Sequence, residues 1–180
     1  MTAISPAISQ KERRVKTLQN LFEDGLRDIL YAEKKILDAL ARMADAATAE
    51  QAGNAFRLHR EQTESQVARL EQVFEMIGQK PGGKKCPAID GILEEGNEIA
   101  REYADSPSLD AGLIAAAQAV EHYEMARYGT LATWAAQLGL ADAAALLDET
   151  LQEEKLTDDL LTQLAEEIAN PEAAEAEAEG

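Results

Sequence analysis

The feature that most constrains this chain is a long apolar stretch, residues 113–138, with acidic side chains in its middle. The stretch is rich in alanine and too long for a β-strand, so it predicts a buried helix. Glu121, Glu124 (or Met125) and Tyr128 share one stripe of that helix. Inward carboxylates are costly unless a metal ion, a salt bridge or a bound proton compensates their charge. The sequence therefore predicts a buried acidic site and leaves these three explanations open.

The rest of the chain also predicts helices. Aromatic residues make up only 4% of the sequence, and alanine, leucine and glutamate dominate, which favours an all-helical protein. Apolar residues that recur at helical spacing predict long helices over about 15–43, 48–77, 106–139 and 142–169, and a shorter one over 88–103. Short links join the long helices into two antiparallel hairpins. We predict an all-α four-helix bundle over residues 14–169, with a long crossover that contains the short fifth helix.

Local signals set the expected ends of these helices. Residues 48–51 have the form of a capping box, and Ser106-Pro107 has the form of an N-cap with proline at the first helical position. The second and third long helices are expected to end at Gly78 and near Gly139. Asn170-Pro171 is expected to stop the fourth. Residues 1–13 are predicted to be flexible, and the acidic tail 170–180 is predicted to be disordered because it has nothing to bury.

Charge and cysteine content limit the classes of partner. The net charge of −17 argues against nucleic acid and against anionic membrane surfaces, and it is compatible with attracting cations. Cys86 is the only cysteine, so no intrachain disulfide can form and a reducing, cytoplasmic setting is expected. We interpret Cys86 as a packing residue. We also expect no signal peptide, because the first residues contain no apolar segment.

Each predicted long helix carries acidic groups near its middle, and the hairpins bring these groups to one height. They are Glu33 on the first helix, Glu61 and Glu64 on the second, Glu121 and Glu124 on the third, and Glu154 and Asp158 on the fourth. In an antiparallel hairpin, residues at one level have numbers that sum to twice the number at the loop centre. The acidic pairs on the second and fourth helices therefore lie close to the levels of Glu33 and Glu124. Because carboxylates bridge and stabilise adjacent hard cations such as Fe and Mn, the pattern favours a two-metal site.

The competing interpretation is an ordinary solvated helix face. Charged residues make up 28% of the chain, so acidic pairs at helical spacing also arise by chance. His59 is either a hydrogen-bonded core histidine or a ligand, and His122 lies beside the inward stripe. Tyr128 either donates a hydrogen bond to a buried carboxylate or only packs.

Several stretches resemble one known family. They are residues 30–34 (LYAEK), 121–124 (EHYE), 128–131 (YGTL), 153–155 (EEK), Thr157-Asp158, and Lys85-Cys86 in the crossover. They resemble the YciE/YciF-like family (DUF892) of the ferritin-like superfamily, over about residues 17–165. The resemblance implies a ferritin-like bundle related to rubrerythrin and manganese catalase. It also implies a bacterial stress association and a homodimer, in a family without an established reaction.

The superfamily pattern of metal ligands matches this chain in part. Its single glutamates correspond to Glu33 and Glu121. Its first Glu-x-x-His motif corresponds to Glu61–Glu64, with glutamate in place of histidine. Its second corresponds to Glu154 with threonine at position 157, and Asp158 stands next door. Both standard histidines are therefore absent.

Two main hypotheses follow for function. The first is a centre of two Fe or Mn ions per chain that acts on O2 or H2O2, as an oxidase, peroxidase or catalase, in oxidative stress or iron handling. Its ligands are Glu33, Glu61, Glu64, Glu121 and Glu154, with Glu124 and Asp158 in reserve and Tyr128 and His59 beside them. The second is a metal-free dimeric bundle that acts as a structural or interaction protein under stress. An iron-storage cage is a third option. None of these involves nucleic acid or a membrane.

Overall fold

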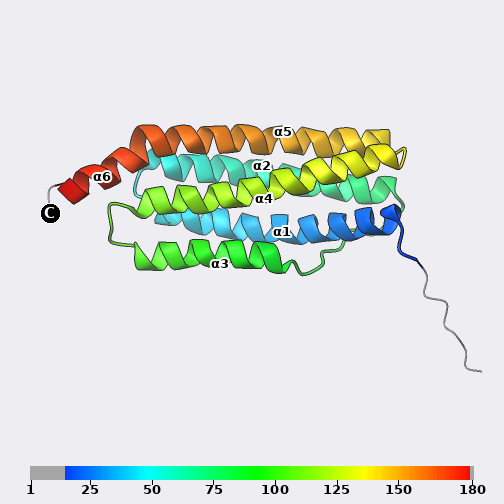
Figure 1. Ribbon diagram of the computed structural model, residues 1–180, viewed down its shortest axis with the longest axis horizontal. Coiled ribbons are helices and arrows are strands. Elements are labelled where there is room, and N and C mark those ends of the chain that lie inside the picture. The colour runs from blue at the N-terminus through cyan, green and yellow to red at the C-terminus, as the bar shows by residue number, and fades with distance from the viewer. Residues whose placement is uncertain (1–14, 179–180) are drawn as a thin grey trace, which may run out of the picture.

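The computed structural model describes residues 15–178, and its long helices run side by side along one axis (Figure 1). The helices are α1 (Leu18–Ala46), α2 (Glu50–Met76), α3 (Pro87–Glu102), α4 (Leu109–Gln137), α5 (Ala141–Leu164) and α6 (Asn170–Ala178). Both α1 and α5 pack against α2 and against α4, and α3 lies on the outside against α1 and α4. This is the predicted all-α, ferritin-like four-helix bundle, with a crossover that contains the short helix α3.

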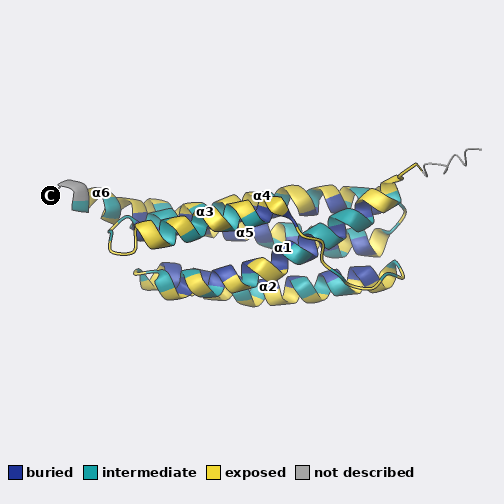
Figure 2. Ribbon diagram, turned by 90° about the horizontal axis from the view of Figure 1, so that it is seen from below, coloured by how far each residue is buried: buried dark blue, intermediate teal, exposed yellow. Residues whose placement is uncertain are grey.

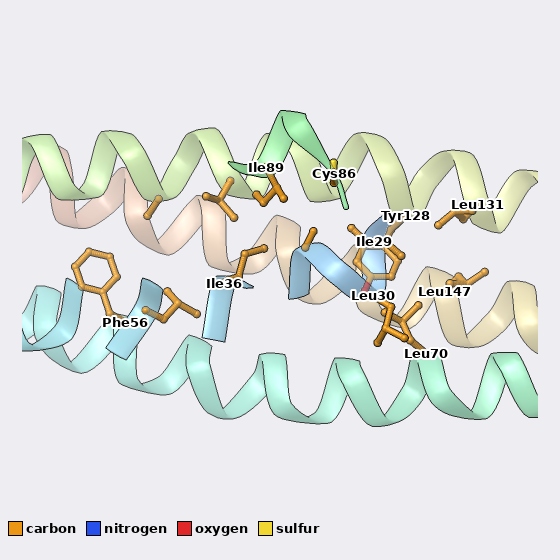
Figure 3. Packing of buried hydrophobic residues seen from close by; sticks show 14 of the residues in the cluster. Ile29, Leu30, Ile36, Phe56, Leu70, Cys86, Ile89, Tyr128, Leu131 and Leu147 are labelled. Carbon is orange, nitrogen blue, oxygen red and sulfur yellow. The ribbon is translucent and has the colours of Figure 1, made fainter. Parts of the chain in front are cut away.

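Buried residues lie on the faces that the helices turn toward one another (Figure 2). Figure 3 shows part of this core, where side chains from all five packed helices point into the space between them. Cys86 is 2% exposed and belongs to this core, with its Sγ 3.2 Å from the Tyr123 hydroxyl. No helix within residues 15–178 is long and apolar enough to cross a membrane.

The start of α2 differs from the prediction. Its N-cap is Ala49, and the Thr48 hydroxyl donates a hydrogen bond to Asp110 Oδ2 at 2.5 Å. The backbone N–H groups of Thr48 and Ala49 donate to the same carboxylate at 2.9 and 2.7 Å. The predicted capping box was therefore wrong, because a buried aspartate of α4 caps α2 and the threonine serves as a donor. A carboxylate suits a helix N-terminus, where backbone N–H groups lack partners.

Other helix ends lie within a few residues of the predicted ones. A true capping box at Thr17 and Asn20 starts α1 at Leu18. The N-cap of α4 is Ser108, two residues after the predicted Ser106, whose hydroxyl oxygen accepts a hydrogen bond from the Ser108 N–H. Gly78 and Gly139 have φ of 68° and 76°. This left-handed conformation favours glycine and ends α2 and α4 as predicted.

The end of the chain corrects another prediction. The helix continues from α5 through a π-helical turn, Ala165–Ala169, into α6. Proline can kink a helix without ending it, and α6, which contains Pro171, is bent away from the line of α5 (Figure 1). Alanine and glutamate are good helix formers. The predicted stop at Asn170-Pro171 and the predicted disorder were therefore wrong for residues 170–178. Residues 179–180 and the N-terminal segment 1–13, predicted to be flexible, lie outside the described residues.

Two glycines of the α3–α4 pair give opposite predictions for alanine substitution. A Cβ at Gly112 would lie 2.6 Å from Ile99 Cγ2, so Gly112→Ala forces α3 away from α4 and is expected to cost about 1–3 kcal/mol. A Cβ at Gly91, in the exposed part of α3, meets no atom of the described residues within 4 Å. Gly91→Ala is therefore expected to stabilise by about 0.5–1 kcal/mol through helix propensity. Urea unfolding of both variants measures the two changes in the free energy of unfolding. If both variants change it in the same direction, the close packing of α3 against α4 at Gly112 is contradicted.

Candidate metal centre

Glu33 and Tyr128 meet at the centre of the bundle, where α1 faces α4. Glu33 lies on the same buried stripe as Ile29 and Ile36, so the helix phase turns its carboxylate inward. Both Glu33 and Tyr128 are 0% exposed. The Tyr128 hydroxyl donates a hydrogen bond to Glu33 Oε1, which confirms one of the two roles expected for this tyrosine. Figure 3 shows Tyr128 among the buried side chains in the space between the helices.

Four further buried residues form a cluster that could hold a metal ion. His59 comes from α2, Glu121 and Glu124 from α4, and Glu154 from α5, and each offers one ligand atom within 4.8 Å of the others. His59 Nε2 lies 3.1 Å from Glu121 Oε1 and 3.9 Å from Glu154 Oε2. The closer contact is poorly aligned for a hydrogen bond, and it becomes an ion pair when the imidazole is protonated. We name these four residues and Glu33 the acidic centre.

Most carboxylate oxygens of the acidic centre have no donor. Within residues 15–178, six such oxygens lack a hydrogen-bond partner: both of Glu124, both of Glu154, and Oε2 of Glu33 and Glu121. Buried polar atoms are normally paired, and a buried charge without a partner is strongly unfavourable. A cation bound among these oxygens would supply the missing compensation, so the donor set fits a metal.

Burial and mutual repulsion favour the protonated form of Glu33, Glu124 and Glu154 in the absence of a metal. Burial, with the charges of Glu33 and Glu154, raises the pKa of Glu124 well above its usual range. Burial and the charge of Glu121 do the same to the pKa of Glu154. Burial raises the pKa of Glu33 to about 7, against the hydrogen bond from Tyr128, which lowers it.

The pKa of His59 moves in the direction that favours the imidazolium. Burial, the largest single effect, lowers this pKa, but the neighbouring carboxylates of Glu121 and Glu33, together with Gln62, leave it raised. One imidazolium cannot neutralise four carboxylates. The acidic centre therefore retains a demand for protons or cations that its own residues do not meet.

Three of the predicted ligands lie outside the acidic centre. Glu61 and Glu64 are exposed, because the inward stripe of α2 runs through His59, Thr63 and Gln66. Glu64 instead pairs with Arg60 at 3.1 Å. The structure thus corrects the expectation that these two side chains reach the bundle core.

Asp158 also lies apart from the acidic centre. It lies on the flank of the buried face of α5 that carries Glu154 and Thr157, and its side chain is 19% exposed. Its carboxylate accepts a hydrogen bond from Gln118 at 3.1 Å and lies 3.3 Å from His122 Nε2. Glu33, Glu121, Glu124 and Glu154 are the predicted ligands that the structure does bring together, and His59 joins them from its expected place beside the site.

The polar surroundings of the centre were not predicted. Arg69, on α2, donates hydrogen bonds to Thr150 at 2.7 Å and to both oxygens of Glu153 at 3.0 and 2.9 Å, and Gln66 also donates to Glu153 at 3.0 Å. This network commits the nearby arginine to Glu153, and within residues 15–178 the acidic centre has no arginine partner. Gln66 lies on the inward stripe of α2, and this position was a signal in the sequence that polar groups surround the centre.

Threonines occupy places next to His59. Thr63 donates to the His59 carbonyl at 2.9 Å, and Thr157, whose hydroxyl lies 3.4 Å from His59 Nδ1, donates to the Glu153 carbonyl at 3.2 Å. Thr157 stands where the superfamily pattern has a histidine. The imidazole of this site comes instead from His59 on α2, the helix that packs against α5 at this point.

Comparison with known proteins places the chain in a family. It matches the family described as Domain of unknown function (DUF892) over residues 17–174. It is 47% identical to Protein YciF of Escherichia coli (strain K12) over 160 residues, which cover 88% of this chain and 96% of that protein.

Solved structures agree with this placement. Those of the E. coli stress protein YciF and of YcfI from Rhodopseudomonas palustris, for which a structural role has been suggested, are each 48% identical to this chain. Each has a TM-score of 0.80 and covers 84% of this chain and 96% of its own. A protein from Xanthomonas campestris pv. campestris, at 19% identity, shares the fold with a TM-score of 0.72, over 89% of this chain and 99% of its own. The family suggested by the sequence motifs is confirmed: the chain belongs to the DUF892 family and is a homologue of the E. coli stress protein YciF.

Proposed function

We propose that the acidic centre holds two Fe or Mn ions and that the protein, as a cytoplasmic homodimer, uses them in oxidative-stress defence or iron handling. The observation that carries this proposal is the set of six carboxylate oxygens, from four buried glutamates, that find no donor in the described part of the chain. In a metal-free bundle such a set must take up protons to remain buried, and bound cations would replace those protons.

The donor chemistry supports Fe or Mn. Carboxylates with a single imidazole suit these ions, whereas zinc sites favour thiolate and histidine. His59, Glu121, Glu124 and Glu154 can surround one cation. Glu33, whose charge acts on both Glu124 and Glu154, extends the site toward a second.

The chain's own residues supply positioning and exclude water. The Tyr128 hydroxyl fixes one oxygen of Glu33 and leaves the other free to bind. Burial keeps bulk water away from the ligand atoms and strengthens their attraction for cations. Held by these glutamates and His59, two Fe or Mn ions would supply the two electrons that, with two protons, reduce H2O2 to two water molecules or O2 to H2O2.

Metal content tests the proposal directly. Protein purified from medium supplemented with Fe or Mn is expected to retain about two ions per chain, and metal at roughly 100 times its Kd is expected to stabilise the fold by about 3 kcal/mol. Glu121→Ala with Glu154→Ala is expected to lower metal affinity by roughly 100-fold or more, since loss of even indirect ligand support costs 10–100-fold. The measurements are elemental analysis and thermal unfolding with and without metal.

The exposed pair on α2 provides a matched control. Glu61→Ala with Glu64→Ala also removes two carboxylates, but both lie outside the acidic centre. This double variant is expected to leave the metal content unchanged. Metal well below one ion per chain in the unaltered protein, with no shift in unfolding temperature, would count against the proposal. Light scattering on the same samples tests the homodimer.

The metal-free structural role predicts a different result. In that case Glu33→Leu and Glu121→Leu stabilise the protein under all conditions, because apolar side chains replace buried carboxylates that have no function. Under the metal proposal the same changes stabilise only the protein treated with chelator.

A further inference from the structure

A cavity of about 140 Å³ lies between α2 and α5 and reaches the acidic centre. At its inner end are His59 and Glu121, which are 3% and 1% exposed. At its outer end are Leu58 and Leu156, which are 51% and 68% exposed. The cavity therefore runs from the surface of the bundle to two of the residues that we propose as ligands.

The walls of the cavity decide what can occupy it. Eight of its twelve lining residues are apolar, and Phe56 and Leu161, at 1% and 2% exposed, form part of the inner wall. A hydrated ion would lose most of its water against such walls. Anions are further disfavoured by the Glu121 carboxylate at the inner end and by the net charge of −17. An apolar cavity of roughly 150 Å³ takes up xenon or benzene, so the fitting occupant is small, uncharged and apolar.

We infer that this cavity binds dioxygen and leads it to the side of the centre formed by His59 and Glu121. The inference rests on the proposed function and selects between its two oxidants. Dioxygen forms only weak interactions with water and enters an apolar cavity readily, whereas H2O2 would leave strong hydrogen bonds behind. Leu58 of α2 and Leu156 of α5 form the mouth, and the small side chain of Ala55 keeps the inner space open.

Xenon tests the cavity in metal-free protein. Xenon gas is expected to shift the NMR signals of the Leu161 and Leu156 methyl groups in a saturable way, because both residues line the cavity. Ala55→Leu fills the inner space, and Leu156→Trp covers the mouth from an exposed position where it cannot disturb folding. Ala55→Leu is expected to abolish saturable binding, and Leu156→Trp is expected to slow the exchange of xenon between the cavity and water. Met76→Trp, at another exposed apolar site on α2, is the matched control and is expected to bind xenon normally.

Oxygen consumption tests the path in Fe(II)-loaded protein. Ala55→Leu and Leu156→Trp are expected to slow the second-order reaction with dioxygen by roughly five-fold or more at unchanged iron content, because a close-packed interior offers no comparable path. Met76→Trp is expected to react at the rate of the unaltered protein. If the two cavity variants also react at that rate, the path is refuted while the metal site stands.

The remaining outcomes separate the inference from the proposed function. Absence of saturable xenon binding to the unaltered protein refutes the gas site, whatever the metal content. A protein that binds xenon but retains no metal refutes the proposed function, and with it the role of the cavity in leading dioxygen to a metal. A change in oligomer size on Leu156→Trp, seen by light scattering, would assign the exposed leucines to a contact between copies and refute access at this mouth.

Discussion

Metal-free protein is expected to lose stability as the pH rises from about 5.5 to about 8. The pKa values of Glu124 and Glu154 in the folded protein are raised well above 4.5 by burial and neighbouring carboxylates, and burial raises that of Glu33 to about 7. Such groups bind more protons in the folded chain than in the unfolded chain, so their stabilising protons are lost as the pH rises through the folded pKa. For Glu33 alone, the rise from 4.5 to about 7 corresponds to roughly 3 kcal/mol in total, of which roughly 2 kcal/mol is lost above pH 5.5.

Thermal unfolding in the presence of a chelator measures this dependence. Glu33→Gln is expected to flatten it, because the amide does not titrate, and Glu64→Gln at the exposed position is expected to leave it unchanged. Addition of Mn²⁺ at the higher pH is expected to restore stability, since the cation replaces the lost protons. An unfolding temperature that rises steadily from pH 5.5 to 8 without metal would show that these carboxylates are compensated in another way.

Asp110→Ala is expected to destabilise the protein by about 3 kcal/mol, which lowers the unfolding temperature by roughly 6–12 °C for a chain of this size. Asp110 is 3% exposed and accepts hydrogen bonds from the Thr48 hydroxyl and from the N–H groups of Thr48 and Ala49. Alanine would leave these donors at the start of α2 without a partner.

Two further variants show whether the charge and the position matter. Asp110→Asn keeps one acceptor oxygen without the negative charge and is expected to lose part of the stability. Asp45→Ala removes an exposed aspartate near the same end of the bundle and is expected to have little effect. A small loss for Asp110→Ala, similar to that of Asp45→Ala, would mean that water satisfies the α2 terminus equally well.

The helices and hairpins were predictable because their signals are local. Helical periodicity and the positions of Gly78 and Gly139 determine where the chain runs straight and where it turns. The hairpin geometry then places the inward glutamates of α1, α4 and α5 near one height. The cap on α2 was not predictable from local signals, because its acceptor, Asp110, lies 62 residues after Thr48.

The error on α2 has a simple physical origin. The spacing of Glu61 and Glu64 suggested chelation, but spacing within a pair does not say which way the pair faces. The apolar stripe does, and it passes through His59 and Thr63. Greater weight on the stripe would have selected His59 as the residue that α2 contributes to the acidic centre.

The crossover connection has a consequence for how the acidic centre assembles. Glu33 and His59 belong to the α1–α2 hairpin, whereas Glu121, Glu124 and Glu154 belong to the α4–α5 hairpin. Each hairpin can form from contacts between neighbours in the sequence, but the complete set of ligands exists only after the two hairpins have docked. A bound ion would therefore hold two separately formed hairpins together. Its dissociation would first loosen the interface between the α1–α2 hairpin and the α4–α5 hairpin.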